Sequence, residues 1–283
     1  MIRFFRKYSV LAWALSVLLS FVILIGFMVI GDSDGISILS YCVTNLMLCF
    51  FLYAVSGKKT FERCGSQTGY VLKNGWPVLI FPFAFFAFGI IGAITNRAAL
   101  NADWPIRLGA CFILMMLAGV SEELGFRALA CDALLPRLRN TRHPFLYTAL
   151  ISGLVFGVSH VILGGFDGWL SVVLGILKIC TTAIFGASMM ILYWKTRNVL
   201  TIGILHGLYD LLPTVYDYLF VTETAVESAG YTGGDMGSLV VYLIQLAVDL
   251  LVLRYMYKRV GTTINFQRVL EDWQAASFSG KGV

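Results

Sequence analysis

Long apolar runs separated by short polar segments extend along the whole chain. There are eight such runs, and most have the ~20 residues that a helix needs to cross the hydrocarbon layer of a membrane. The runs are continuous, whereas transmembrane β-strands alternate with a period of two. The pattern predicts an all-α protein, a polytopic membrane helix bundle with about eight transmembrane helices. We place these at residues 8–30, 36–55, 78–94, 107–135, 145–163, 168–194, 199–220 and 238–255.

Composition supports a membrane protein and the distribution of charge predicts its orientation. The chain is 58% hydrophobic and only 13% charged, against about 25% charged in a typical soluble domain. Seventeen of the 21 Lys and Arg fall in the segments on one side of the predicted spans. Basic loops stay in the cytoplasm, so both termini are expected there. The net charge of +5 reflects this asymmetry and requires no nucleic-acid partner.

The chain divides into one membrane domain and a short tail. The even spacing of the apolar runs predicts a single transmembrane helical domain over residues 1–260, with its polar motifs in a core at about 107–220. Residues 261–283 form a cytoplasmic tail. Phe266, Val269, Leu270 and Trp273 recur there at helical spacing, which favours an interfacial amphipathic helix. A loosely ordered tail is the alternative.

Two adjacent acids interrupt the fourth apolar run. No charge precedes Glu122 and Glu123 between residues 108 and 120, and Arg127 follows one helical turn after Glu123. A charge at membrane depth costs at least ~2.5 kcal/mol on insertion scales, so we expect these residues to have a structural or functional role. Glu123 and Arg127 are spaced for an ion pair, which would leave Glu122 free to act as a base. A purely structural buried triad is the alternative.

Two of the three histidines also lie inside apolar runs. His160 follows small residues that allow close helix approach, and by itself it could be an ordinary interhelical hydrogen-bond donor. His206 and Asp210 share one helix face. Their spacing suits two metal ligands, an imidazole oriented by a carboxylate, or a buried hydrogen-bonded pair.

Counting residues from the basic loops predicts the depth of these groups. At 1.5 Å per residue, Glu122 and His160 each lie roughly 22 Å from the cytoplasmic end, whereas His206 lies only roughly 10 Å in. Helix tilt would have to close this difference. Asp132 is close to the predicted boundary and is expected to be solvated.

Three short motifs occur in order along this part of the chain. EELGFR at residues 122–127 fits EExxxR, FGVSH at 156–160 fits FxxxH, and HGLYD at 206–210 fits Hxxx(N/D). Together they resemble the CPBP intramembrane protease family, also called Abi or CAAX-protease-like, which includes the Rce1-type prenyl-protein endopeptidases. The resemblance covers residues 120 to 210.

The resemblance implies roles for the matched residues. The residue at Glu122, with the histidine at His160, activates water for peptide hydrolysis, while His206 and Asp210 stabilise the oxyanion. Glu123, Arg127 and Phe156 belong to the supporting part of the motifs.

One departure concerns Asp210, where the eukaryotic branch of that family has asparagine. An ionised aspartate accepts hydrogen bonds but cannot donate one. Asp210 is therefore protonated, or orients His206, or ligates a divalent metal such as zinc together with His206 and His160. A mechanism that requires no cofactor and a metal-dependent mechanism both remain open.

The function favoured by these patterns is an intramembrane endopeptidase that acts on a membrane-associated peptide or a lipid-modified protein. A non-proteolytic membrane scaffold or self-immunity protein that binds a peptide is the alternative, and a transporter is a weaker one. Lipid is an expected partner and nucleic acid is not. The expected location is the cell membrane, or the endoplasmic reticulum membrane in a eukaryote.

Overall fold

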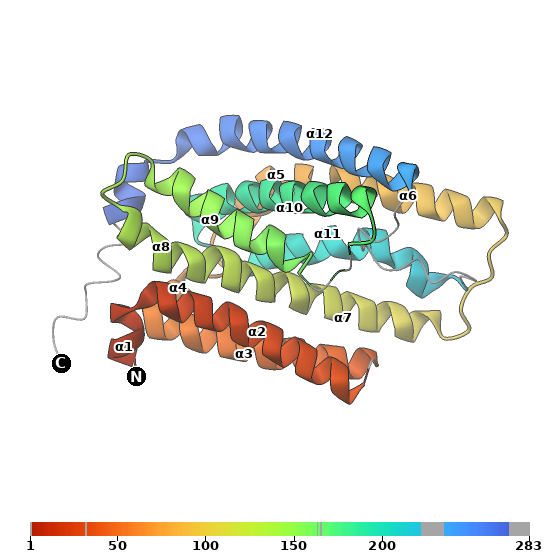
Figure 1. The fold of residues 1–283 in the computed structure, drawn as a ribbon, viewed down its shortest axis with the longest axis horizontal. Coiled ribbons are helices and arrows are strands. Elements are labelled where there is room, and N and C mark those ends of the chain that lie inside the picture. The colour runs from red at the N-terminus through yellow and green to blue at the C-terminus, as the bar shows by residue number, and fades with distance from the viewer. Residues whose placement is uncertain (1, 32, 163, 165, 222–234, 272–283) are drawn as a thin grey trace.

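The computed structural model describes residues 2–31, 33–162, 164, 166–221 and 235–271, and these residues fold as a helical bundle (Figure 1). Helices are the regular elements of the described ranges, which confirms the all-α prediction. The long helices run along roughly one common direction.

Within the described ranges, seven helical stretches are long and apolar enough to cross a membrane. The predicted span at 145–163 is shorter than expected, because α9 (Pro144–Ser159) has only 16 residues and ends just before His160. Its length is about 24 Å. The seven are α2 (Ser9–Ile30), α3 (Asp34–Ser56), the α5–η1–α6 stretch (Thr68–Thr95), the α7–η2–α8 stretch (Trp104–Leu138), α10 (Trp169–Thr196), α11 (Val199–Leu219) and the α12–η3 stretch (Met236–Thr263). Within these stretches α5 is Thr68–Gly75, α6 is Ile80–Thr95 and α12 is Met236–Arg259.

The helices are arranged so that α7 and α11 lie inside the bundle (Figure 1). Helices α2 and α3 pack together on one side of α7, and α10 packs against α9 and α12. The short helix α1 (Ile2–Lys7) and the end of α12 lie at the same end of the bundle. We call this the basic end, because the loops that carry most Lys and Arg gather there. That it faces the cytoplasm stays a prediction.

Glycines bring the backbones of α7 and α11 into direct contact. A Cβ added at Gly119 would lie 2.4 Å from the carbonyl oxygen of Gly203 and 2.4 Å from the amide nitrogen of Gly207. Small residues permit such close approach between membrane helices. The contact lies one turn from Glu122 and Glu123 on α7, and Gly207 is the direct neighbour of His206. The sequence therefore sets α7 and α11 in the register that brings these side chains together.

The segment between α7 and α8 is a π-helical turn. It is η2 (Leu124–Leu129), and it joins α7 (Trp104–Glu123) to α8 (Ala130–Leu138) without a break. Such turns rotate the helix faces on either side of them and are frequent at functional sites. The turn carries Arg127, whose side chain is buried.

Asp132 is buried and ion-paired, so the prediction that it is solvated was wrong. Its carboxylate lies 2.8 Å from Nη2 of Arg197 and accepts a hydrogen bond from the Ser56 hydroxyl. Arg197 links α10 to α11 in a left-handed backbone conformation with φ of 54°. Although burial opposes its charge, the Asp132 carboxylate keeps the pKa of Arg197 above its ordinary value.

This ion pair accounts for the absence of the predicted difference in level between Glu122 and His206, whose side chains lie 3.4 Å apart. The link between α10 and α11 is buried, so α11 begins deeper in the bundle than the position of its basic residue suggests. Glu122 precedes Asp132 by ten residues and His206 follows Arg197 by nine. These separations are about 15 Å and 13.5 Å along the two helices. Glu122 and His206 therefore lie at nearly the same level.

The tail begins as a helical turn packed on the bundle. Residues 266–271 are helical, and the Asn265 side chain accepts a hydrogen bond from the Arg268 amide. The Phe266 ring lies 4.4 Å from that of Phe145 and 6.0 Å from that of Trp194, between centroids. Here the apolar side of the turn contacts protein. Trp273 lies outside the described residues, so the amphipathic helix stays a prediction.

Candidate active site

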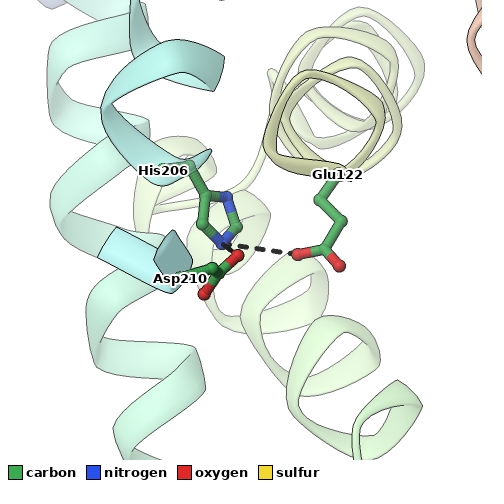
Figure 2. A group of neighbouring side chains, drawn as sticks. All are labelled: Glu122, His206 and Asp210. Carbon is green, nitrogen blue, oxygen red and sulfur yellow. Dashed lines mark ion pairs between the residues drawn. The ribbon is translucent and has the colours of Figure 1, made fainter. Parts of the chain in front are cut away.

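His206 contacts three carboxylates, and Figure 2 shows two of them, those of Glu122 and Asp210. Its Nδ1 atom is 2.8 Å from Oε1 of Glu123. Its Nε2 atom is 3.4 Å from Oε2 of Glu122 and 3.5 Å from Oδ2 of Asp210. The imidazole is buried, with 3% of its side chain exposed. The predicted pairing of His206 with Asp210 on one helix face is present.

The partners of His206 define where protons are needed. Glu123 is paired with Arg127, so its carboxylate accepts a hydrogen bond from Nδ1–H. Nε2 then faces Glu122 and Asp210, and neither an imidazole lone pair nor a carboxylate can donate a hydrogen bond. The contact is attractive only if a positive charge or a proton lies there. A protonated Nε2, a protonated carboxyl group and a bound cation each satisfy this requirement.

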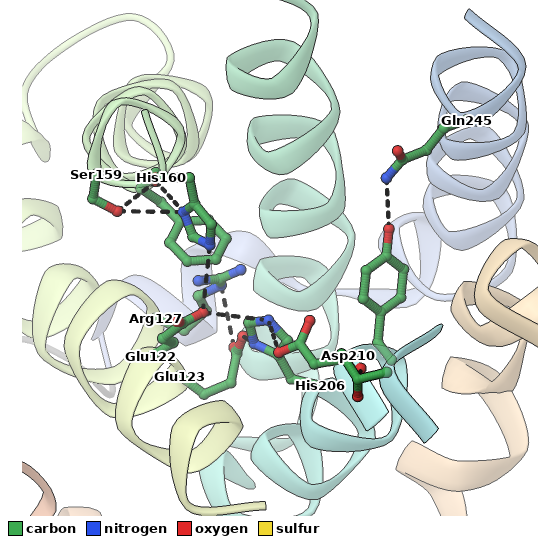
Figure 3. Close-up of polar contacts among 11 residues, drawn as sticks. Glu122, Glu123, Arg127, Ser159, His160, His206, Asp210 and Gln245 are labelled. Atoms are coloured by element: carbon green, nitrogen blue, oxygen red, sulfur yellow. Dashed lines mark hydrogen bonds and ion pairs between the residues drawn. The ribbon is translucent and has the colours of Figure 1, made fainter. Parts of the chain in front are cut away.

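Glu123, which contacts His206, forms the predicted ion pair with Arg127 (Figure 3). Arg127 Nε lies 3.1 Å from Glu123 Oε2, and both side chains are almost completely buried. The guanidinium carbon lies 4.2 Å from the centroid of the Phe156 ring, a distance at which the cation and the ring attract. A Cβ at Gly186 on α10 would be 3.1 Å from Nη2, so that glycine leaves space for the guanidinium.

His160 approaches Glu122 from the other side of the site. It follows the last residue of α9, and its Nδ1 atom is 2.8 Å from the carbonyl oxygen of Phe156. A carbonyl oxygen only accepts, so this bond assigns the hydrogen to Nδ1 and leaves Nε2 as an acceptor. Nε2 lies 4.0 Å from Oε2 of Glu122 (Figure 3).

That separation is too long for a direct hydrogen bond and matches one bridging water. A water oxygen about 2.8 Å from each atom would see them at an angle of roughly 90°, close to the angle between its own hydrogens. Both atoms accept, so they hold both hydrogens of the water. Its lone pairs then point away from Glu122 and His160.

A cavity reaches these two residues from between the helices. It has a volume of about 180 Å³, and Glu122 and His160 each expose about a quarter of their side chains. Sequence reasoning missed the walls from α2 and α3, which belong to no motif; the polar Ser20 and Tyr41 inside apolar runs were the available signal. The lining residues are Val17, Ser20, Phe21, Leu24, Tyr41, Leu48, Ser121, Glu122, Gly125, Phe126, Ser159 and His160.

The residues best placed to hold a metal are Glu122, His206 and Asp210. One ligand atom from each lies within 4.8 Å of the others (Figure 2). The predicted set contained His160 in place of Glu122, whereas the group found among the described residues contains Glu122 and not His160. A combination of imidazole and carboxylate ligands suits zinc. Histidines that bind a metal through one ring nitrogen usually donate a hydrogen bond from the other one to a carboxylate, and Glu123 is such a partner for Nδ1 of His206.

One segment of the chain matches a known family. Residues 104–212 match the family model described as type II CAAX prenyl endopeptidase Rce1-like. The match runs from the start of α7 into α11 and contains all seven residues that the motifs singled out. Comparisons with curated proteins and with solved structures gave no significant match.

Proposed function

We propose that the chain is a member of the Rce1-like family of CAAX-type endopeptidases, whose model matches residues 104–212, and that it cleaves a peptide bond within the membrane by means of water activated by Glu122 and His160. The observation that carries the proposal is the 4.0 Å separation of Glu122 Oε2 and His160 Nε2. Both atoms lie on a cavity and both accept hydrogen bonds. A shared water is therefore oriented for attack.

Glu122 takes a proton from this water while the water oxygen attacks the carbonyl carbon of the scissile peptide bond. His160 accepts the second hydrogen bond and fixes the direction of the remaining lone pair. Glu122 then returns the proton to the amine that leaves. Proton transfer by a positioned side chain contributes typically ~10²–10⁴-fold to a rate. No serine or cysteine nucleophile is needed for these steps.

His206 supports the negative charge that develops on the carbonyl oxygen. With Nδ1–H bonded to Glu123, a second proton on Nε2 makes the ring a cation that points into the site. Asp210 beside it donates a hydrogen bond when protonated. Preorganised donors of this kind are worth ~3–4 kcal/mol each in the transition state. The buried Glu123–Arg127 pair keeps the ring in this orientation.

A divalent cation held by Glu122, His206 and Asp210 would polarise the water or the carbonyl in the same place. In the proposal the proton on His206 Nε2 supplies the positive charge that the two carboxylates require. Glu122 is then not bound to a metal and can act as the base, and His160 can share the bridging water with it. This is why we favour the mechanism that requires no cofactor.

The substrate is proposed to be a membrane-associated peptide or a lipid-modified protein. Apolar residues of α2, among them Val17, Phe21 and Leu24, line the same cavity as Glu122. An apolar segment of a substrate, or a lipid attached to it, can lie against these residues while its backbone reaches Glu122.

The test compares membranes that contain the wild type with membranes that contain Glu122→Gln. Mass spectrometry of peptides should find new carboxyl termini only with the wild type. Glu62→Gln is the matched control, because it makes the same chemical change on an exposed residue of the short helix α4 (Lys59–Glu62). Fragments that persist with Glu122→Gln would remove the proposed base. A phenotype that survives replacement of both Glu122 and His160 would favour the scaffold.

A further inference from the structure

A second cavity lies at the basic end of the bundle, apart from the candidate active site. We call it the basic cleft; its volume is about 650 Å³, within the range of small-molecule sites. Its walls come from the end of α10 and its link to α11, the loop before α5, and the start of the tail. The lining residues are Arg63, Ser66, Gln67, Trp194, Lys195, Thr196, Arg197, Thr263, Ile264, Asn265, Arg268 and Val269.

The charge of the basic cleft has one sign. Four of its lining residues are Lys or Arg, and none of those lining residues is acidic. Asp132, which does not line the cleft, forms an ion pair with Arg197 and balances the charge of that residue. Lys195 and Arg268 are further basic residues of the lining. Thr263, Asn265 and Gln67 supply hydroxyl and amide groups beside them, so the surface offers many donors to an anion.

The walls of the basic cleft are held in place by the rest of the fold. Lys195 Nζ donates to the carbonyl oxygen of Thr263 at 3.0 Å, which ties α10 to the tail. The amide of Leu200 donates to the carbonyl oxygen of Cys64 at 3.0 Å, which ties α11 to the loop before α5. Phe266 packs on Trp194. The basic groups are thus spread over segments distant in sequence but fixed relative to one another.

We propose that the basic cleft binds a phosphate-bearing anion, and that its source is the headgroup of an anionic phospholipid. Lys and Arg side chains bind phosphate through charge-assisted hydrogen bonds. The cleft lies at the end of the bundle that the loop charges assign to the cytoplasm, where the leaflet is negatively charged. A free phosphate has the same recognition chemistry, so the experiment separates the two sources. The proposal does not depend on the proteolytic activity.

The test uses the full chain purified from membranes and the double variant Lys195→Gln with Arg268→Gln. The matched control is Lys258→Gln with Arg259→Gln, which removes the same charge at the same end from exposed residues outside the cleft. Each protein is placed in nanodiscs of phosphatidylcholine with and without phosphatidylglycerol. Native mass spectrometry then counts the phosphatidylglycerol that each protein retains. Size-exclusion profiles and thermal unfolding verify that each variant is folded.

The proposal expects the wild type and the control to retain at least one phosphatidylglycerol more than the cleft variant. A second arm measures thermal stabilisation of the detergent-purified proteins by inorganic phosphate. Stabilisation lost only in the cleft variant, without preferential lipid retention, would support the anion site and identify a free phosphate as its ligand. Equal lipid retention by both variants, together with equal phosphate effects, would overturn the proposal. If the double variant does not fold, Arg268→Gln on the exposed tail serves in its place.

Discussion

Nε2 of His160 lies 4.0 Å from Oε2 of Glu122, and both atoms act as hydrogen-bond acceptors. Two acceptors at this distance hold a water by its two hydrogens and leave its lone pairs free. The relationship depends on the carbonyl of Phe156, which takes the hydrogen on Nδ1 of His160. A backbone atom thus decides which nitrogen of the imidazole faces the site.

Asp210→Asn is expected to preserve activity. The amide donates a hydrogen bond toward the developing oxyanion and removes one of the two carboxylates that face Nε2 of His206. We expect kcat/KM within about tenfold of the wild type, or ~1.4 kcal/mol. Asp210→Ala lacks the donor and should lose ~10²–10³-fold in kcat. Equal losses in both variants would show that the carboxylate itself is required.

Glu123→Gln is expected to destabilise the fold as well as the site. It leaves the buried guanidinium of Arg127 without its charged partner, and loss of one partner of a buried pair costs ~3–5 kcal/mol. Thermal unfolding in detergent measures the change. The double variant Glu123→Gln with Arg127→Met removes the orphaned charge and should be more stable than the single one. A single variant as stable as the wild type would contradict the importance of the pair.

Gly119→Ala is expected to displace α11 and impair the site. The new methyl group would lie 2.4 Å from backbone atoms of Gly203 and Gly207, so the helices must separate, at a cost of ~1–3 kcal/mol. Gly109→Ala on the same helix is the matched control, because nothing lies within 4 Å of its added Cβ. Thermal unfolding and hydrolysis should both fall for the first variant alone. Equal behaviour of the two would show that close contact of α7 and α11 is not needed.

Removal of divalent ions is expected to leave hydrolysis intact. In the proposed mechanism the proton on His206 Nε2 balances Glu122 and Asp210, so no cation is required. Dialysis of the purified protein against a chelator, followed by metal analysis and a rate measurement, checks this. Activity lost on dialysis and restored by zinc would instead assign Glu122, His206 and Asp210 as metal ligands.

The sequence singled out polar residues that the structure brings together, but it did not reveal their surroundings. Glu122, His160 and His206 were recognisable because polar groups inside apolar runs cost free energy on membrane insertion, which indicates a role for each of them. The Glu123–Arg127 pair followed from helical spacing alone. These features depend on neighbours along one helix, and the pattern of residues records them directly.

What escaped prediction depends on contacts between distant segments. The pairing of Asp132 with Arg197 joins residues 65 positions apart, and it places α11 deeper than a count from the loop suggests. The cavity walls from α2 and α3 carry no motif, so only packing reveals them. The short α9 also ends earlier than its apolar run, because the chain leaves the helix at His160.

The most direct test of the central claim is a double-mutant cycle with Glu122→Gln and His160→Ala, measured as single-turnover hydrolysis by the purified protein. If both residues act on one water, each single variant loses ~10²–10⁴-fold, and the double variant is little slower than the slower single one, because either change already removes the oriented water. Losses that multiply in the double variant, or substantial activity in Glu122→Gln alone, would contradict the shared water.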